Sequence, residues 1–190
     1  MILLPLLVAS ALSGCASLPK SACQSGAWYD IGMRDGAAGR TEDRYLDHAQ
    51  ACAKHGLPGN REQWLLGRTR GLERYCTARN GVYVGEHSDR YNGVCPVERE
   101  GEFLRGFDVG RDLAEARSRL AAVDGEMHRI RRLLEPPKDD EHKDDKQHKQ
   151  PKPLSDAERI ALAFQLGVHA VERERLVHAV DSIEQVARRM

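Results

Sequence analysis

Apolar residues recur along residues 97–134 at alternating separations of four and three positions. The set comprises Val109, Leu113, Ala116, Leu120, Val123, Met127, Ile130 and Leu134. This spacing is a heptad repeat, which places all of these side chains on one face of a helix. At about 1.5 Å per residue, the helix would be longer than about 50 Å. Pro136 and Pro137 are expected to end it, because proline removes a helical hydrogen bond.

A second long helix is predicted over residues 154–190, after a polar linker at 135–153 that we expect to be mobile. Ser155 and Glu158 have the spacing of a capping box at its start. Its apolar residues form two stripes displaced around the helix, one of Ala157, Ile160, Phe164, Gly167 and Val171, the other of Leu176, Ala179, Ile183, Val186 and Met190. The linker allows the two helices to form an antiparallel hairpin, and a parallel dimer along the heptad stripe is the alternative.

Before the long helix, the chain repeats an aromatic residue followed by glycines three and seven positions later. The three copies are Tyr29, Gly32 and Gly36; Trp64, Gly67 and Gly71; and Phe103, Gly106 and Gly110. Residues at this spacing share one face of a helix. Each glycine costs about 1 kcal/mol relative to alanine in a helix interior, so we expect another backbone to pack against it. In the first copy, Gly36 at a helix end is an equally good interpretation.

The segments between these copies have weaker patterns. Residues 41–54 predict a short helix, which Gly56 and Pro58 end. Turn-forming residues dominate residues 80–96, so we expect a loop there, with a short hairpin at Asn80 and Gly81.

Four cysteines follow Cys15, at Cys23, Cys52, Cys76 and Cys95, and all precede residue 96. An even number of cysteines predicts two disulfides if the chain is exported to an oxidising compartment, which its N-terminal segment, described next, indicates. Three connectivities are open, and we favour Cys23 with Cys52 and Cys76 with Cys95, because each pair brackets one local unit. No two cysteines have the close spacing that structural zinc sites usually show, so we expect no metal here.

The N-terminal segment 1–14 contains only apolar and small residues and is too short to span a bilayer, which indicates a secretory leader. Leu12, Ser13, Gly14 and Cys15 resemble the lipobox of bacterial lipoproteins. That resemblance implies lipid attachment at Cys15, where several acyl chains would anchor the protein stably. Ala16 follows, and the absence of aspartate there favours the outer membrane, with the protein facing the periplasm. No Lys or Arg precedes Lys20, so we expect the translation start to lie upstream.

Composition excludes several function classes. The chain has 29 basic and 29 acidic residues, so it lacks the positive excess of a nucleic-acid-binding protein. Nucleophile-elbow, phosphate-loop and paired-histidine zinc motifs are missing, and His48 or His55 near Asp47 does not make a triad. For Asp35 and Arg68 we favour an ion pair between repeat units over an acid and its partner in a cleft. We therefore expect no enzymatic activity, no cofactor and no metal.

His142 and His148 lie in an acidic stretch of the linker. A solvated segment has no preformed coordination geometry, so we interpret them as linker residues rather than metal ligands.

The order of cysteines, glycines and aromatic residues resembles the bacterial envelope lipoproteins of domain-of-unknown-function family 2799. The residues that carry the resemblance are Cys23, Trp28, Gly32, Asp35, Gly36, Cys52, Gly67, Arg68, Gly71, Leu72, Tyr75, Cys76, Gly85, Tyr91, Gly93, Cys95, Phe103 and Gly110. The resemblance covers residues 15–115 and implies a lipoprotein without assigned activity. Trp64 stands where the family pattern has a tyrosine, which is a conservative change at a packing position.

These observations predict a mostly α-helical protein, with a disulfide-linked, glycine-rich helical domain at 15–96, a long helix at 97–134 and a C-terminal helix at 154–190. The expected role is structural or in protein interaction, through an envelope partner or a homo-oligomer formed by the C-terminal helices. The alternative is an envelope ligand-binding or processing protein with a pocket lined by Trp28, Trp64, Tyr75 and Tyr91.

Overall fold

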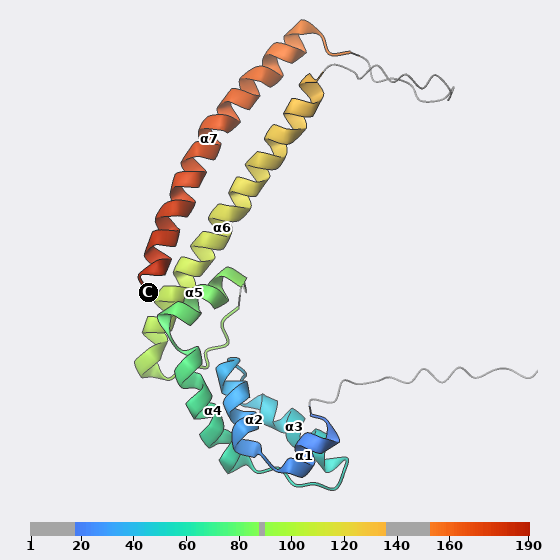
Figure 1. Ribbon diagram of the computed structural model, residues 1–190, viewed down its shortest axis with the longest axis vertical. Helices are drawn as coiled ribbons and strands as arrows, with labels where there is room; N and C mark the ends of the chain where they lie inside the picture. The colour runs from blue at the N-terminus through green and yellow to red at the C-terminus, as the bar shows by residue number, and fades with distance from the viewer. Residues whose placement is uncertain (1–17, 88–89, 136–152) are drawn as a thin grey trace, which may run out of the picture. The chain divides into compact units, whose positions relative to one another are not determined.

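The computed structural model describes residues 18–87, 90–135 and 153–190, and over these residues every regular element is a helix (Figure 1). The helices are α1 (Lys20–Ser25), α2 (Trp28–Ala37), α3 (Asp43–Ala53), α4 (Arg61–Tyr75), α5 (Ala78–His87), α6 (Val97–Leu134) and α7 (Asp156–Arg188). The mostly α-helical prediction is confirmed. The Leu12–Cys15 motif, both linker histidines and nearly all of the predicted linker lie outside the described residues.

The chain divides into two compact units. The first comprises Met1–Cys76 and Asn92–Pro96, and the second comprises Thr77–Tyr91 and Val97–Met190. Helix α5 therefore packs with the long helix α6, within the second unit.

The centre of the first unit is the helix pair α2 and α4, which touch through glycines. A Cβ atom added at Gly32 or Gly36 would lie within 3.0 Å of the α4 backbone, at Trp64 and Arg68. A Cβ atom at Gly67 would meet the α2 backbone at Tyr29 in the same way. Residues further along α2 contact residues further along α4, so the two helices run parallel to each other. Helix α2 ends one residue after Gly36, at Ala37, with Ala38 as its C-cap and Gly39 at a positive φ of 64°. Gly36 therefore lies in the last turn of α2, as the helix-end interpretation expected, and also packs against α4.

Helices α1 and α3 are attached to this pair by side chains. Cys23 of α1 and Cys52 of α3 form a disulfide, and both sit in a core with Trp28, Ile31 and Trp64. The second disulfide joins Cys76 to Cys95. These are the two pairs that the cysteine order favoured.

The second unit contains another glycine-packed pair, α5 and α6. A Cβ atom at Gly81 or Gly85 would lie within 3.0 Å of the α6 backbone at Phe103 or Phe107, and one at Gly106 would meet Ala78 of α5. The loop and hairpin expected from residue 80 onwards are therefore wrong as far as His87, because Asn80 and Gly81 lie inside α5. The turn preference of Asn-Gly is overridden by tertiary packing. Gly81 and Gly85 form a fourth glycine pair that the three-copy pattern missed.

Helices α6 and α7 form the antiparallel hairpin. Arg173 of α7 donates to Asp124 of α6 at 2.7 Å, and Arg117 of α6 donates to Glu184 of α7 at 2.7 Å. Between them Leu113, Ala116 and Val180 form a buried cluster. The heptad stripe of α6 is thus covered within a single chain, with Leu113, Val123, Met127 and Ile130 buried. The bounds of α6 are those that the periodicity predicted.

Candidate functional site

A buried polar cluster in the first unit joins three helices. Asp35 of α2 accepts two hydrogen bonds through the same oxygen, Oδ2, one from Trp64 Nε1 of α4 and one from His48 Nε2 of α3, both at 2.9 Å. When the carboxylate is ionised it can only accept, and the bond to His48 then requires a proton on Nε2. Trp64 is fully buried and His48 is 2% exposed. The cluster satisfies buried donors that would otherwise destabilise the core.

Arg68 of α4 extends this polar region towards the turn after α2. Its Nε donates to the backbone oxygen of Arg40 at 3.0 Å, and its guanidinium lies 4.0 Å from Glu42 and 5.9 Å from the centre of the Trp64 ring. Burial lowers the pKa of Arg68, against the opposing effect of Glu42 and Asp35. The expected ion pair between Asp35 and Arg68 is not among the contacts of the described residues, because Asp35 instead bonds His48 and Trp64.

The chemistry available at this cluster is limited by access. A carboxylate beside an imidazole supplies two of the three members of a catalytic triad, but a reacting group must also reach the histidine. His48 is buried, and only 14% of the Asp35 side chain is exposed. The described residues contain no group of three or more His, Cys, Asp or Glu side chains placed to hold a metal ion. The arrangement therefore fits a role in holding α3 against the α2 and α4 pair.

Of the four aromatic residues proposed for a ligand pocket, three are buried in the first unit and the fourth, Tyr91, is half-buried in the second. Trp28 and Trp64 contact Tyr45 at ring-centre distances of 5.8 and 5.6 Å. Tyr75 is buried with its ring against Gly39, which has a positive φ of 64°. Tyr91, in the second unit, packs on Phe103 at 4.8 Å and donates to Glu100. Protein atoms occupy the ring faces that a ligand would need.

The packing residues of the glycine repeat are buried except for one. Trp64 and Phe103 are completely buried, and the glycines that follow them are buried as well. Tyr29 is exposed, and only its backbone takes part in the contact with Gly67. In the first copy, Trp28 supplies the buried ring instead.

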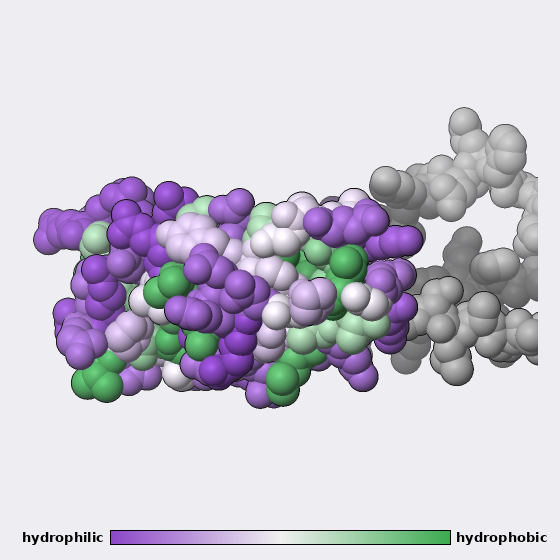
Figure 2. Space-filling view, turned by 90° about the horizontal axis from the view of Figure 1, so that it is seen from below, coloured by the Kyte–Doolittle hydropathy of each residue, from purple (hydrophilic) through white to green (hydrophobic). Residues whose placement is uncertain are grey.

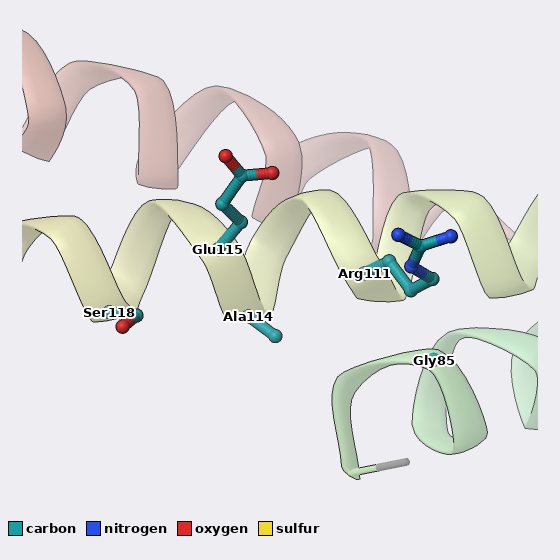
Figure 3. A pocket seen from close by; sticks show the side chains of 5 residues that line it. All are labelled: Gly85, Arg111, Ala114, Glu115 and Ser118. Atoms are coloured by element: carbon teal, nitrogen blue, oxygen red, sulfur yellow. The ribbon is translucent and has the colours of Figure 1, made fainter. Parts of the chain in front are cut away.

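A small open pocket lies in the second unit between the end of α5 and α6 (Figure 3). It is lined by Gly85, Arg111, Ala114, Glu115 and Ser118 and has a volume of about 310 Å³. In Figure 3, Glu115 points towards α7, whereas Ala114 and Ser118 point away from it. Specific ligand sites usually have polar groups that converge on one point, and these do not.

The described surface shows one concentrated apolar feature, on α7. Ile160, Phe164, Val168 and Val171 are 70%, 73%, 51% and 53% exposed. We call these four residues the outer face of α7. A groove of about 450 Å³ continues from it along Val168, Val171, Glu172 and Arg175. By contrast, the side of the molecule drawn in Figure 2 shows hydrophobic residues in small groups among hydrophilic ones.

The outer face of α7 corresponds to the first of the two apolar stripes in the sequence. The side of α7 that meets α6 is instead marked by Arg173, which bonds Asp124. Leu162, Leu166 and His169 lie on that same side at helical spacing and are half-buried. The sequence pattern reveals both faces, but it does not show which of them packs on α6.

Comparison with known proteins gives a match to one family. A family model described as "Protein of unknown function (DUF2799)" matches residues 27–112, which run from the residue before α2 to the first half of α6. No curated protein and no solved structure matches the chain. No helix of the described residues is long and apolar enough to cross a membrane.

Proposed function

The chain belongs to the DUF2799 family through residues 27–112, and on that premise we propose that it is a non-enzymatic lipoprotein of the outer membrane. In this proposal Cys15 carries the lipid anchor, the protein faces the periplasm, and the α6–α7 hairpin is an arm that binds a protein partner. The family has no assigned function, so the support comes from the chain's own residues.

The observation that carries the interaction role is the outer face of α7. Contiguous apolar surface on a soluble protein commonly marks an interaction site. Residues 160–171 contain no Asp, Glu, Lys or Arg, although this segment is accessible on one side of the hairpin. A helix that is apolar all round is normally buried on all sides. A partner would complete that burial.

The buried aromatic residues favour the interaction role over the pocket alternative. Trp28, Trp64 and Tyr75 have their ring faces against other protein groups, so a ligand would have to displace core packing. The Asp35 and His48 pair is likewise inaccessible. Both observations support a role without catalysis.

Lipid attachment is tested by labelling cells with radioactive palmitate. We expect the wild-type protein to carry label and to sediment with outer membranes, and Cys15→Ser to lose both properties because the thioether cannot form. Ser17→Ala, two positions away, is the matched control and should keep the label. Unchanged labelling of Cys15→Ser would remove the anchor from the proposal.

Partner binding is tested by photo-crosslinking in intact cell envelopes. A crosslinking amino acid at Phe164 should give a protein adduct, because that side chain is 73% exposed within the outer face. The same amino acid at His128, an exposed position of α6, should give none. Equal yields at the two positions, or no adduct at Phe164, would contradict the interaction role.

A further inference from the structure

The apolar segment of α7 has two sides, of which the chain covers one. Towards α6 lie Leu162, Leu166 and His169, in line with the Arg173 to Asp124 hydrogen bond. Away from α6 lies the outer face, whose four side chains are each more than half exposed. Bundle helices bury two such sides against different neighbours. The hairpin therefore lacks one neighbour along residues 160–171.

Gly167 lies on the same side of α7 as the outer face, where its missing side chain leaves a hole. The glycines of α2, α4 and α5 each stand against the backbone of a partner helix, which explains their presence. Gly167 lies in the interior of α7, and a Cβ atom added there would meet nothing within 4 Å. An interior glycine destabilises a helix relative to alanine, and a partner packed into the hole at Gly167 would offset that cost. Gly167 is three residues from Phe164, so the two are neighbours on one face of α7. The ring of Phe164 protrudes from this face, and Gly167 leaves a hole beside it.

We propose that the outer face of α7 binds the same face of a second copy of this chain, with the two α7 helices antiparallel. This inference rests on the proposed function and names the partner of the arm. In the register that sets Phe164 of one copy beside Gly167 of the other, Ile160 lies beside Val171. Two hairpins joined in this way form a four-helix bundle.

Charge complementarity selects this occupant and this direction. The same register brings Arg175, which lies at the end of the groove beyond Val171, opposite Asp156 in the acidic first turn of the other copy. Among the described residues, Asp156 and Arg175 have no ion-pair partner within the chain. A parallel pair would instead place Arg175 beside Arg175 and acidic turn beside acidic turn. The net charge of zero adds no repulsion between copies.

A lipid surface fits this face less well than a second copy. Helices that lie on membranes have basic side chains flanking the apolar face, where they meet anionic headgroups. Residues 160–171 contain no Lys or Arg, and the exposed first turn of α7 is acidic. Basic side chains stand only at its two ends, at Arg159 and Arg175, so the face lacks charge along its length that would hold it on a bilayer.

The first test measures self-association of the whole chain by sedimentation equilibrium in a mild detergent. We expect a dimer for the wild type and at least about tenfold weaker dimerisation for Phe164→Ser, which removes the central ring. Leu46→Ser, at another largely exposed apolar residue, is the matched control and should dimerise normally. Gly167→Leu should also weaken the dimer, because it fills the hole. Gly125→Leu, where a Cβ atom likewise meets nothing, should not.

The second test uses the charges. Arg175→Glu alone and Asp156→Lys alone should each dimerise weakly, because each change places like charges together. Mixing the two variants in equal amounts should restore the dimer, since the introduced glutamate of one copy then meets the introduced lysine of the other, and the unaltered pair forms at the opposite end. Circular dichroism should show the same helix content for all variants, because every altered side chain is exposed.

Three results would overturn self-association. These are a monomeric wild-type chain at all concentrations tested, single charge variants that dimerise normally, or a mixture that stays monomeric. A photo-crosslink from Phe164 only to a different protein would also overturn it, yet would leave the proposed interaction role standing. Loss of all crosslinking would contradict both.

Discussion

The glycine-packed helix pairs and the α6–α7 hairpin are both helical, but they are held together in different ways. In α2 with α4, and in α5 with α6, the backbone of one helix lies directly on the backbone of the other at glycines. In the hairpin, side chains such as Leu113 and Val180 separate the two backbones. Glycine contacts leave no space for change, whereas a side-chain seam can repack. The two designs therefore suit a fixed scaffold and an adaptable arm.

The family match follows the same division. Residues 27–112 include α2, α4, α5 and the part of α6 that carries Gly106 and Gly110. The hairpin seam from Leu113 onwards, together with all of α7, lies beyond the matched residues. The glycine-packed scaffold is the part of this chain that matches the DUF2799 model. The outer face of α7, on which the proposed function rests, belongs to the part that the match does not reach.

The strongest test of this difference adds one methyl group at a glycine of the glycine-packed pair and one at a glycine of the hairpin. Gly67→Ala should destabilise the first unit by about 4 kcal/mol or more, beyond the usual 1–3 kcal/mol for overpacking, because the opposing atoms are backbone. Gly125→Ala in α6 meets nothing and should stabilise by about 0.5 to 1 kcal/mol. Urea unfolding followed by circular dichroism measures both. Similar changes in the two variants would contradict the distinction.

Removing a disulfide should lower the stability of the first unit without changing that of the hairpin. Cys23→Ser with Cys52→Ser opens a loop closed across 29 residues and should cost about 3 kcal/mol. The effect should be confined to the first unit, because residues 97–190 contain no cysteine. Hydrogen exchange should show faster exchange in α1 and α3 and unchanged protection along α6. Equal loss of protection in α6 would show that the hairpin depends on the first unit.

Truncating the hairpin seam should cost less than either change. Ile130→Ala removes a fully buried side chain and should destabilise by about 2 kcal/mol, the lower end for such a change, because a two-helix seam can close part of the cavity. Leu133→Ala, three residues away and 45% exposed, should change stability by less than about 0.5 kcal/mol. Thermal unfolding measures the difference. A loss of about 4 kcal/mol at Ile130 would indicate a seam as rigid as the glycine contacts.

The sequence predicted the long helix of the hairpin better than the glycine-packed helix pairs. The heptad spacing of α6 is a property of one helix, so the pattern alone gave its bounds. Helix α5 was missed because Asn80-Gly81 and the β-favouring Val82-Tyr83-Val84 run are local signals, whereas Gly81 and Gly85 are explained only by the α6 backbone. The spacing of Gly81 and Gly85, four apart as in the other copies, was the signal that could have identified it.

The candidate sites show the same limit. The bond between Asp35 and His48 joins residues 13 positions apart on different helices, and no motif connects them. On α7, residues 160–171 are apolar on both sides, so periodicity cannot distinguish the side that packs on α6 from the outer face. Only the position of Arg173 against Asp124 assigns them.

The two regions should also differ, by a smaller amount, in how their stability depends on pH. Burial raises the pKa of Tyr75 above its ordinary value of 10.0. The unfolded chain therefore loses this proton before the folded chain does, so the stability of the first unit should fall as the pH rises above about 10. Tyr75→Phe should lessen this alkaline loss, as measured by urea unfolding between pH 8 and about 11. An unchanged slope would exclude Tyr75 as its source.

The hairpin should respond at the opposite end of the pH scale and more weakly. A hydrogen bond from Arg117, followed by one from Arg188, lowers the pKa of Glu184 below its ordinary value of 4.5. The folded state then holds this carboxylate ionised more strongly than the unfolded state, so its contribution is present above the ordinary pKa and is lost as the pH falls through the lowered value. Glu184 is partly exposed to solvent and its partner Arg117 more so, so the effect should be small and weaker in salt. In Glu184→Gln, the hydrogen-exchange rates of α7 should lose the acid dependence that the wild type shows. The exchange rates of α4, which packs through glycines, should depend on pH as in the wild type. A change in both helices would mean that the hairpin and the glycine-packed pair are energetically coupled.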